Sequence, residues 1–348
     1  MSPTPDIARF VWETRYRDPD ARPAEAGVED SWRRVARAVA AAERESATWT
    51  RRYLDILEGY RFLPAGRILA GAGTARRVTL FSCFVMGPID DSIEGIFESL
   101  KEGALTMQQG GGVGYDFSTL RPHGSRARTT GAVASGPVSF MRIWDAMCAT
   151  ILSTGARRGA MMATLSCDHP DIGQFIDAKR EGGALPHFNL SVLVSDAFMQ
   201  AVREGAEWPL VFPERGETHR AVPARELWRR LCEAACDSAE PGVLFIDRIN
   251  AANNLGYCER LRATNPCGEE PLPPYGACNL GSVNLVKFVS QPFTPQAAWK
   301  LGELCDTVRT AVRFLDDVTD ISGFPLPRQR AEALRSRRVG LGVTGLAD

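Results

Sequence analysis

The chain has 348 residues, of which 44% are apolar and 24% charged, and its formal net charge is −1. This length allows two domains or one large α/β barrel, and the composition excludes disordered, collagen-like and low-complexity proteins. Its 41 basic residues, mostly Arg, are spread along the chain and balanced by 42 acidic ones. A surface that neutralises nucleic-acid phosphates is therefore not expected.

The first residues are charged, unlike the apolar core of a signal peptide. The longest near-apolar stretch, 81–89, has about half of the ~18 residues that a membrane span needs. We therefore expect a cytoplasmic protein that does not enter a membrane. Nine cysteines, an odd number without a C-x-x-C pair, argue against a disulfide scaffold and direct attention to reactive cysteines.

Hydrophobic periodicity predicts a helical region at 29–59, followed by a turn-rich segment around Gly66. Further strands are predicted at 78–86, 114–117, 163–167, 188–194, 209–212, 242–247 and 277–289. Further helices are predicted at 92–108, 137–153, 170–180, 195–204 and 224–238, and from a Thr294–Pro295 start to about 318. The last residues, VGLGVTGLAD, indicate the opening of another strand. This alternation favours an α/β architecture with a substantial parallel sheet.

A glycine cluster lies at 110–114. It does not match the dinucleotide-binding pattern, because Phe117 stands where the third glycine is needed, and no Gly-Lys dipeptide is present to form a phosphate-binding P-loop. Two interpretations remain open: a tight turn into a strand, and glycine amides that approach a ligand.

Arg128 and the pair Arg157–Arg158 lie in glycine-punctuated loops. Their guanidinium groups would suit a phosphate, although solvated loop arginines fit the same pattern. No metal site is expected, because the pairs Cys167/His169 and Cys232/Cys236 lack a second pair at zinc-finger spacing.

The sharpest local signal is the segment Asn265-Pro266-Cys267-Gly268-Glu269. If it is extended, Asn265, Cys267 and Glu269 project to one side, because alternate residues share a face. A thiol, a carboxylate and an amide together suit hydrogen or proton transfer. A buried structural cysteine in a turn remains the alternative.

Two other cysteines bear on this choice. Cys83 lies in the first predicted strand, and Cys278 opens the strand that follows the loop. If Cys83 and Cys278 form a redox pair, a separate reactive cysteine at 267 would be an unusual combination and would favour the reactive interpretation of Cys267.

A series of motifs in this order resembles the catalytic subunit of ribonucleotide reductase, most closely its adenosylcobalamin-dependent (class II) branch. The motifs are RFLPAGRILAGAGT, FSCFVMGPIDDSI, QGGGVGYDFSTLRP, ASGPVSFMRIWD, GARRGAMMATLSCDHPDI, FNLSVLVSD, PGVLFIDRIN, NPCGEEPLPPYGACNLGSVNL and RVGLGVTGLAD. The resemblance implies a ten-stranded α/β barrel of two halves with a central finger loop. It places a mainly helical region at 1–75 and the first, incomplete part of the barrel at 76–348, with the finger loop at 264–276.

The resemblance also implies residue roles. Cys267 is similar to the thiyl-radical cysteine that abstracts the ribose 3′-hydrogen. Glu269 resembles the base at the 3′-hydroxyl, and Asn265 the amide that binds the ribose hydroxyls. Cys83 and Cys278 resemble the pair that is oxidised to a disulfide as the 2′-hydroxyl leaves.

Binding residues follow from the same resemblance. The substrate-binding walls correspond to Ala65, Ser82, Cys83, Gly111, Gly112, Asn265, Pro266, Cys267, Gly268 and Glu269. The expected effector contacts are Asp90, Arg128, Ser135, Arg157 and Arg158, of which Arg128 and Ser135 belong to a first specificity loop at 121–136 and the arginine pair to a second at 154–162.

The function implied is reduction of ribonucleoside diphosphates or triphosphates to 2′-deoxyribonucleotides. The expected cofactor is adenosylcobalamin. The expected partners are deoxynucleotide or ATP effectors, a thioredoxin- or glutaredoxin-type reductant, the missing C-terminal half and a second copy of the chain. A class I large subunit with a partner-generated radical and a non-catalytic nucleotide-binding fragment remain as alternatives. The glycyl-radical branch is disfavoured, because Cys278 would have no redox role there.

Overall fold

The computed structural model describes residues 6–126, 131, 133–151, 159–180, 184–212 and 217–347. Arg128, Arg157 and Arg158, three of the expected effector contacts, lie outside the described residues. None of the described helices combines the length and the apolar character that crossing a bilayer requires.

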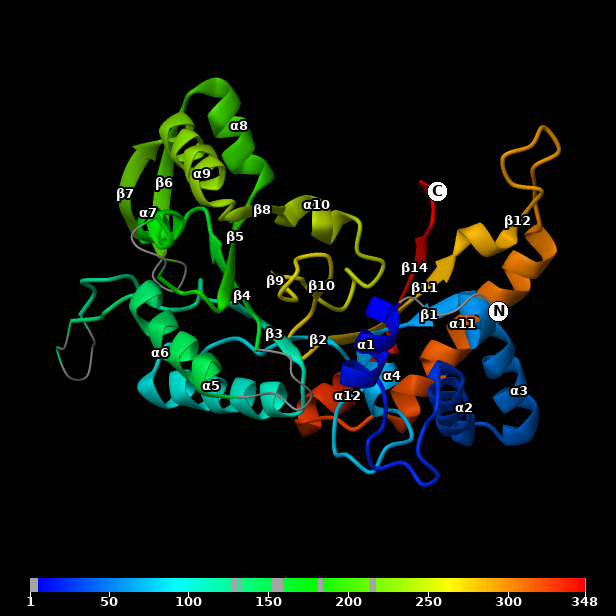
Figure 1. Cartoon of the computed structure of the whole chain (residues 1–348). Coiled ribbons are helices and arrows are strands. Elements are labelled where there is room, and N and C mark those ends of the chain that lie inside the picture. Colours follow the sequence, from blue (N-terminus) through cyan, green and yellow to red (C-terminus); the bar gives the residue numbers. More distant parts are fainter. Residues whose placement is uncertain are drawn as a thin grey trace.

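A helical layer opens the chain and packs on a much later helix (Figure 1). It contains α1 (Asp6–Arg15), α2 (Val28–Val39), α3 (Ser46–Leu57) and α4 (Gly66–Gly71), and its later partner is α11 (Leu301–Ile321). Val35, Leu57 and Phe314 are fully buried in their shared core. The N-terminal helices therefore do not close a core of their own, and the domain boundary expected at 75/76 stays a prediction.

An eight-stranded sheet forms the centre of the molecule, with β1, β11, β2, β3, β4, β5 and β8 in that order and β14 added to β11. The strands are β1 (Phe62–Pro64), β2 (Cys83–Val85), β3 (Gly112–Asp116), β4 (Met161–Ser166), β5 (Phe188–Val194), β8 (Gly242–Phe245), β11 (Ala277–Asn284) and β14 (Val339–Thr344). The run from β2 to β8 is parallel, whereas β11 is antiparallel to β1 and β2 and parallel to β14. The predicted α/β class is confirmed, and the curled sheet matches one part of a barrel wall.

Helices cover the outer face of this sheet. They are α5 (Ile93–Gln108), α6 (Pro137–Thr150), α7 (Ile172–Asp177), α8 (Asp196–Glu204), α9 (Ala224–Ser238) and α12 (Pro327–Ser336). The short helix α10 (Ile246–Ala251) follows β8 and buries none of its residues. Alternate residues of β3 point to α6, where Tyr115 and Phe117 make edge-on contacts with Trp144. Gly112 and Gly114 consequently face the opposite, inner side of the sheet.

Two sequence predictions need correction. The predicted strand 78–86 forms a strand only at Cys83–Val85, because the Leu80 N–H donates to Ser322 Oγ instead of to a neighbouring strand. The strand predicted at 209–212 is confirmed as part of β6 (Glu207–Phe212), which pairs with β7 (Glu217–Pro223) in a separate hairpin. The helix expected from Thr294 begins only at Leu301, because Thr294 is held in a turn by the N–H groups of Gln296 and Ala297.

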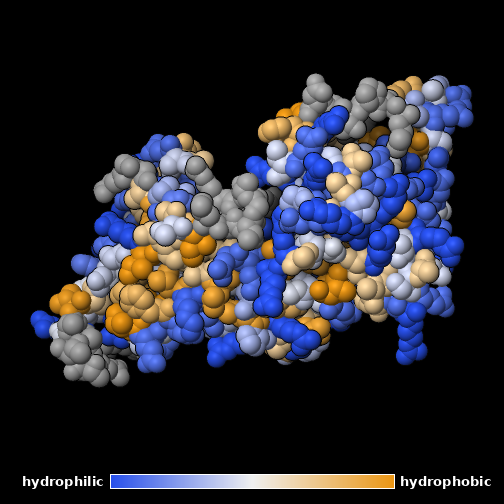
Figure 2. All heavy atoms as spheres, turned by 60° about the horizontal axis from the view of Figure 1, so that its bottom comes forward, coloured by the Kyte–Doolittle hydropathy of each residue, from blue (hydrophilic) through white to orange (hydrophobic). Residues whose placement is uncertain are grey.

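The segment before α11 forms a small ribbon of β12 (Val289–Ser290) and β13 (Ala298–Trp299). On the other side of the molecule, apolar residues gather on the surface of the lobe that carries α5 (Figure 2). Ile93, Phe97 and Leu105 of this helix are all exposed.

Candidate active site

The finger loop is a β-hairpin that lies in the middle of the molecule, between β4–β5 and β11–β14 (Figure 1). Its strands are β9 (Ala263–Thr264) and β10 (Pro271–Leu272), which pair antiparallel. Between them the chain turns tightly, since the N–H of Gly268 donates to the Asn265 carbonyl at 3.1 Å. Gly268 has φ +89°, a left-handed conformation that favours glycine.

The glycine cluster provides the floor on which this hairpin rests. A Cβ atom at Gly114 would lie 1.7 Å from the Thr264 carbonyl oxygen, and one at Gly112 would lie 2.8 Å from Pro266 Cγ. Side chains at these positions would push the hairpin away from β3. The close backbone approach is to the finger hairpin of the same chain, while Gly110 (φ +96°) makes the tight turn out of α5.

Cys83 and Cys278 are direct register partners in the antiparallel pairing of β2 and β11. Opposed residues in such a pair have Cα atoms about 4.5–5.5 Å apart, inside the ~4.4–6.8 Å range of disulfides. Both residues are free thiols and are buried, at 8% and 7% exposure. The two cysteines thus lie on neighbouring strands, in a register that allows a disulfide between them.

Asn265 anchors the hairpin tip to this cysteine pair. Its side chain is fully buried, and its Nδ2 donates to Cys83 Sγ at 3.2 Å. Its Oδ1 accepts the backbone N–H of Glu270 at 3.0 Å. The amide is thus oriented from both ends, and it faces a cysteine of the pair.

The expectation that Asn265, Cys267 and Glu269 share one face of an extended segment is wrong in its geometry. Because the tip is a turn, alternation does not apply, and Asn265 is buried whereas Cys267 and Glu269 are exposed. Cys267 lies at the end of the hairpin. Next to it, the Pro266 carbonyl accepts a 2.6 Å hydrogen bond from Asn189 Nδ2 of β5, which ties the tip to the sheet.

Two consecutive carboxyl groups lie beside Cys83. One side-chain oxygen of Glu269, one of Glu270 and Cys83 Sγ all lie within 4.8 Å of one another. Glu270 did not emerge from the sequence analysis as a site residue. The only signal for it was the Glu-Glu dipeptide, whose second member turns inward at the start of β10 and is buried.

Burial controls the protonation of this cluster. It raises the pKa of the Cys83 and Cys278 thiols well above their usual range, and the Glu270 carboxylate adds to the effect. Burial likewise raises the pKa of Glu270 to about 7. At neutral pH both cysteines are therefore thiols that hold their protons, while Glu270 is poised between its two states.

Ser82, Gly111 and Gly112 lie at the amino ends of β2 and β3, whereas Ala65 follows the carboxyl end of β1. The Ser82 carbonyl accepts the Gly112 N–H at 2.8 Å, and the Gly111 N–H donates to Thr106 at 3.1 Å. Ala65 joins the sheet through a 2.9 Å bond from its N–H to the Leu280 carbonyl. Ser82 and Gly112 therefore lie beside Cys83 and Pro266, and their role as substrate-binding walls stays a prediction.

The expected effector segments are joined by one ion pair. Arg121, which opens the 121–136 loop, donates from Nε to Asp91 Oδ2 at 2.6 Å, directly after Asp90. Asp90 and Ser135 are both exposed. The N–H of His123 also donates to Asp171 at 2.8 Å, so the loop is anchored close to its start.

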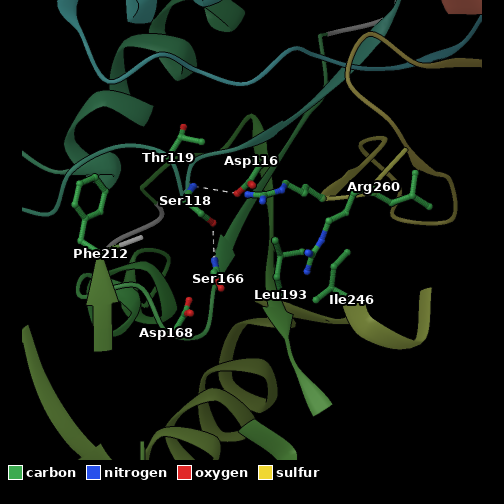
Figure 3. Close-up of a pocket in the computed structure, with 11 residues that line it drawn as sticks. Asp116, Ser118, Thr119, Ser166, Asp168, Leu193, Phe212, Ile246 and Arg260 are labelled. Atoms are coloured by element: carbon green, nitrogen blue, oxygen red, sulfur yellow. Dashed lines mark hydrogen bonds between the residues drawn. The ribbon is translucent and has the colours of Figure 1, made fainter. Parts of the chain in front are cut away.

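A cavity of about 290 Å³ lies at the carboxyl ends of β3, β4 and β5 (Figure 3). Asp116 accepts the Ser118 N–H at 3.0 Å there, and Ser118 Oγ accepts the Ser166 N–H at 2.8 Å. Arg260 and Asp168 also line it. This is the end of the sheet where ligands of α/β proteins usually bind, yet Cys83 and Gly112 stand at the amino ends of their strands.

Comparison with known proteins decides the family. A family described as "Ribonucleotide reductase, barrel domain" matches residues 81–348, and one described as "Ribonucleotide reductase, all-alpha domain" matches residues 4–77. This chain belongs to the ribonucleotide reductase family. The resemblance found in the sequence motifs is confirmed.

Individual relatives of this chain carry more specific names. It is 44% identical over 97% of its length to a vitamin B12-dependent ribonucleoside-diphosphate reductase of Mycobacterium tuberculosis (strain CDC 1551 / Oshkosh), covering 49% of that protein. It is 42% identical over 85% of its length to a Thermoplasma acidophilum protein of the same name, covering 38% of it. A ribonucleoside-diphosphate reductase large subunit of Vaccinia virus is 30% identical over 84% of this chain, which covers 41% of the viral protein. The chain spans about half the length, or less, of these relatives.

Proposed function

We propose that this chain supplies the radical cysteine and the reducing cysteine pair for the conversion of ribonucleotides to 2′-deoxyribonucleotides. The observation that carries the proposal is the register pairing of Cys83 with Cys278, with Asn265 of the finger hairpin bonded to Cys83 Sγ at 3.2 Å. A two-electron donor thereby lies directly beneath the hairpin that presents Cys267.

In this proposal the exposed thiol of Cys267, as a thiyl radical, takes the 3′-hydrogen of the bound ribose. The Glu269 carboxylate, within 4.8 Å of Cys83 Sγ, removes the proton of the 3′-hydroxyl. The raised pKa values of Cys83 and Cys278 keep both thiols protonated. The 2′-hydroxyl then leaves as water with the proton of one thiol, and the hydrogen of the other thiol is transferred to C2′. Cys267 returns its hydrogen to C3′, and Glu269 returns its proton to the 3′-oxygen. The two electrons come from closing the disulfide between them.

Asn265 orients this arrangement. One amide hydrogen is directed to Cys83, and Oδ1 accepts the Glu270 N–H. The second amide hydrogen and the second lone pair of Oδ1 could bind ribose hydroxyls. Ser82 and Gly112 at the strand ends, with Ala65 and Gly111 behind them, would form the wall against which the sugar lies.

The cofactor we propose is adenosylcobalamin. Relatives named as vitamin B12-dependent are 44%, 42% and 32% identical to this chain, compared with 30% for a relative named only as a large subunit. The site fits such a group, because Cys267 is exposed at a hairpin tip where a bulky molecule can reach its sulfur. When bound, it would supply the organic radical that oxidises the Cys267 thiol.

We further propose that the remaining barrel strands and the substrate-phosphate site come from a C-terminal half, and that a thioredoxin- or glutaredoxin-type dithiol re-reduces the pair. Nucleotide effectors would bind near Asp90, Ser135 and the loops that contain Arg128, Arg157 and Arg158. The exposed apolar residues of α5, Ile93 among them, favour a homodimer formed through this helix.

The test is reconstitution. The 348-residue chain alone is expected to form no deoxyribonucleotide, because ribose is not held at reactive distance without the phosphate site. Adding the C-terminal half, adenosylcobalamin and a dithiol should give turnover. Ribonucleoside diphosphates and triphosphates are each tested as substrate. Cys267→Ser should abolish it, while Cys305→Ser, a change at an exposed cysteine of α11, should not.

Each outcome separates the alternatives. Turnover that requires a radical-generating partner protein and ignores cobalamin would assign the chain to the class I large subunits. Nucleotide binding without turnover under any of these conditions would identify a non-catalytic fragment. Activity in the Cys267→Ser variant would overturn the radical assignment.

A further inference from the structure

Glu270 is a buried acid that has no role in the reaction proposed above. Its side chain is 9% exposed, and neither carboxyl oxygen has a well-aligned hydrogen-bond partner among the described residues. Buried carboxyl groups are ordinarily bonded or neutralised. An unbonded one therefore requires an explanation.

The position of Glu270 is fixed by the hairpin. Its N–H donates to Asn265 Oδ1 at 3.0 Å, and its carbonyl accepts the Asn265 N–H at 3.2 Å. Its carboxyl group lies within 4.8 Å of Cys83 Sγ, and the thiols of both Cys83 and Cys278 interact with it. The acid is thus held against both members of the cysteine pair.

We propose that Glu270 donates the proton to each thiolate released when a disulfide between Cys83 and Cys278 is reduced. This inference rests on the proposed function, since it requires the two cysteines to act as a redox pair. It adds a proton donor to the re-reduction step, a role distinct from that of Glu269 at the ribose.

The step balances as thiol–disulfide exchange with an external dithiol. A thiolate of the dithiol attacks one sulfur of the pair, a new sulfur–sulfur bond forms, and the old bond breaks with its electrons on the other sulfur. This released thiolate takes the proton of the Glu270 carboxyl group. Solvent reprotonates Glu270, and the second thiol of the reductant releases the second cysteine in the same way. The reductant is oxidised to its disulfide, and the two protons that it loses to solvent replace those delivered.

Burial explains why a donor is needed. A thiolate at Cys83 or Cys278 is strongly disfavoured, as the raised pKa of both thiols indicates. Water reaches these sulfurs poorly, because both residues are more than nine-tenths buried. A carboxyl group with a pKa of about 7 still holds its proton about half of the time at neutral pH.

The other polar groups around the pair do not replace it. Asn265 offers a hydrogen bond to Cys83 but no exchangeable acid. Arg338 favours the charged form of Cys278 from a distance and is itself paired with Glu259 and Glu332. Glu269 is exposed and raises the pKa of Glu270 by its negative charge, and it offers a path for protons from solvent.

The test follows the disulfide in the 348-residue chain, without substrate or cofactor. The chain is oxidised with diamide in the presence of a chelator, which removes trace metal ions that catalyse thiol oxidation. Reduction by dithiothreitol is then followed by differential alkylation and peptide mapping of Cys83 and Cys278. Rate constants are measured from pH 5 to pH 9. Each is divided by the concentration of dithiothreitol thiolate at that pH, so that ionisation of the reductant does not contribute to the pH profile.

The wild-type rate constant is expected to be level in acid and to fall about tenfold per pH unit above pH ~7. In Glu270→Gln it should be roughly tenfold or more lower at pH 6 and should not fall with pH. Glu98→Gln, which removes an exposed carboxylate of α5, should follow the wild-type profile. Glu270→Asp, which keeps the acid on a shorter side chain, should be slower but retain the pH-dependent fall.

A Glu270→Gln profile that superimposes on wild type would overturn this inference and leave the redox pair intact. Failure of wild type to form the Cys83–Cys278 disulfide would overturn both. Circular dichroism of each variant separates loss of the proton donor from loss of fold, and Glu270→Asp provides the comparison if the Gln variant unfolds.

Discussion

Cys83 and Cys278, 195 positions apart in the sequence, stand directly opposite each other where β2 and β11 pair antiparallel. Each thiol is buried, and each is influenced by the same carboxyl group, that of Glu270. The pairing brings two cysteines from distant parts of the chain, one before and one after the finger hairpin, side by side in the sheet.

Mild oxidation should therefore join these two cysteines first among the buried ones. With diamide, peptide mapping is expected to find a Cys83–Cys278 disulfide, whereas Cys148 and Cys167, also buried, should remain free thiols. Cys83→Ala should leave Cys278 alkylatable after oxidation. A disulfide from Cys278 to any other cysteine in the folded wild-type chain would contradict the register.

Glu270 should make the fold less stable as pH rises. Its pKa is raised from 4.5 to about 7, so the folded chain binds more protons than the unfolded chain between these values, and the free energy of unfolding falls across that window. Above pH ~8 the penalty approaches about 3 kcal/mol. Urea unfolding of Glu270→Gln should show higher stability than wild type at pH 8 and little difference at pH 4. Equal free energies of unfolding for wild type and Glu270→Gln at pH 8 would contradict a raised pKa of Glu270.

Gly114 should be intolerant of a side chain. Its Cβ would lie 1.7 Å from the Thr264 carbonyl oxygen, a backbone atom that moves only with the whole hairpin. Gly114→Ala is expected to lower the free energy of unfolding by about 3 kcal/mol or more. Gly302→Ala, in α11 with open space around its Cβ, should leave stability unchanged or raise it by up to about 1 kcal/mol. Similar denaturation curves for the two variants would argue against the packing of the hairpin on β3.

Asn265 should stabilise the hairpin tip through its buried amide. Asn265→Ala leaves the Glu270 N–H without its acceptor, which costs about 1–3 kcal/mol. The same substitution should raise the alkylation rate of Cys83. The Cys83 sulfur loses its hydrogen bond to Asn265 and is no longer shielded by the Asn265 side chain. Thermal unfolding and timed alkylation measure both effects. Asn254→Ala, at an exposed position, should change stability by no more than about 0.5 kcal/mol.

The residues of the proposed site were named from the sequence, and they remain a prediction, but their geometry could be predicted only in part. Motif order singled out Asn265, Cys267, Glu269 and the two cysteines of the pair. Assuming an extended segment placed the first three on one face, and the turn at Gly268 changed that arrangement. Glu270 carried no motif of its own, so its burial was visible only in the fold.

Local periodicity determined most of the elements. The predicted strand 188–194 and the predicted helix 224–238 have the bounds of β5 and α9, and the helix expected at 92–108 begins one residue later, with Ser92 as its N-cap. These features depend on the alternation of neighbouring side chains and on capping, which a sequence displays directly. Only the tertiary structure decided that Cys83 pairs with Cys278, that Gly114 supports the hairpin and that Glu270 is a buried acid. Each of these depends on contacts between segments far apart in the chain, where register and burial are set by packing rather than by local pattern.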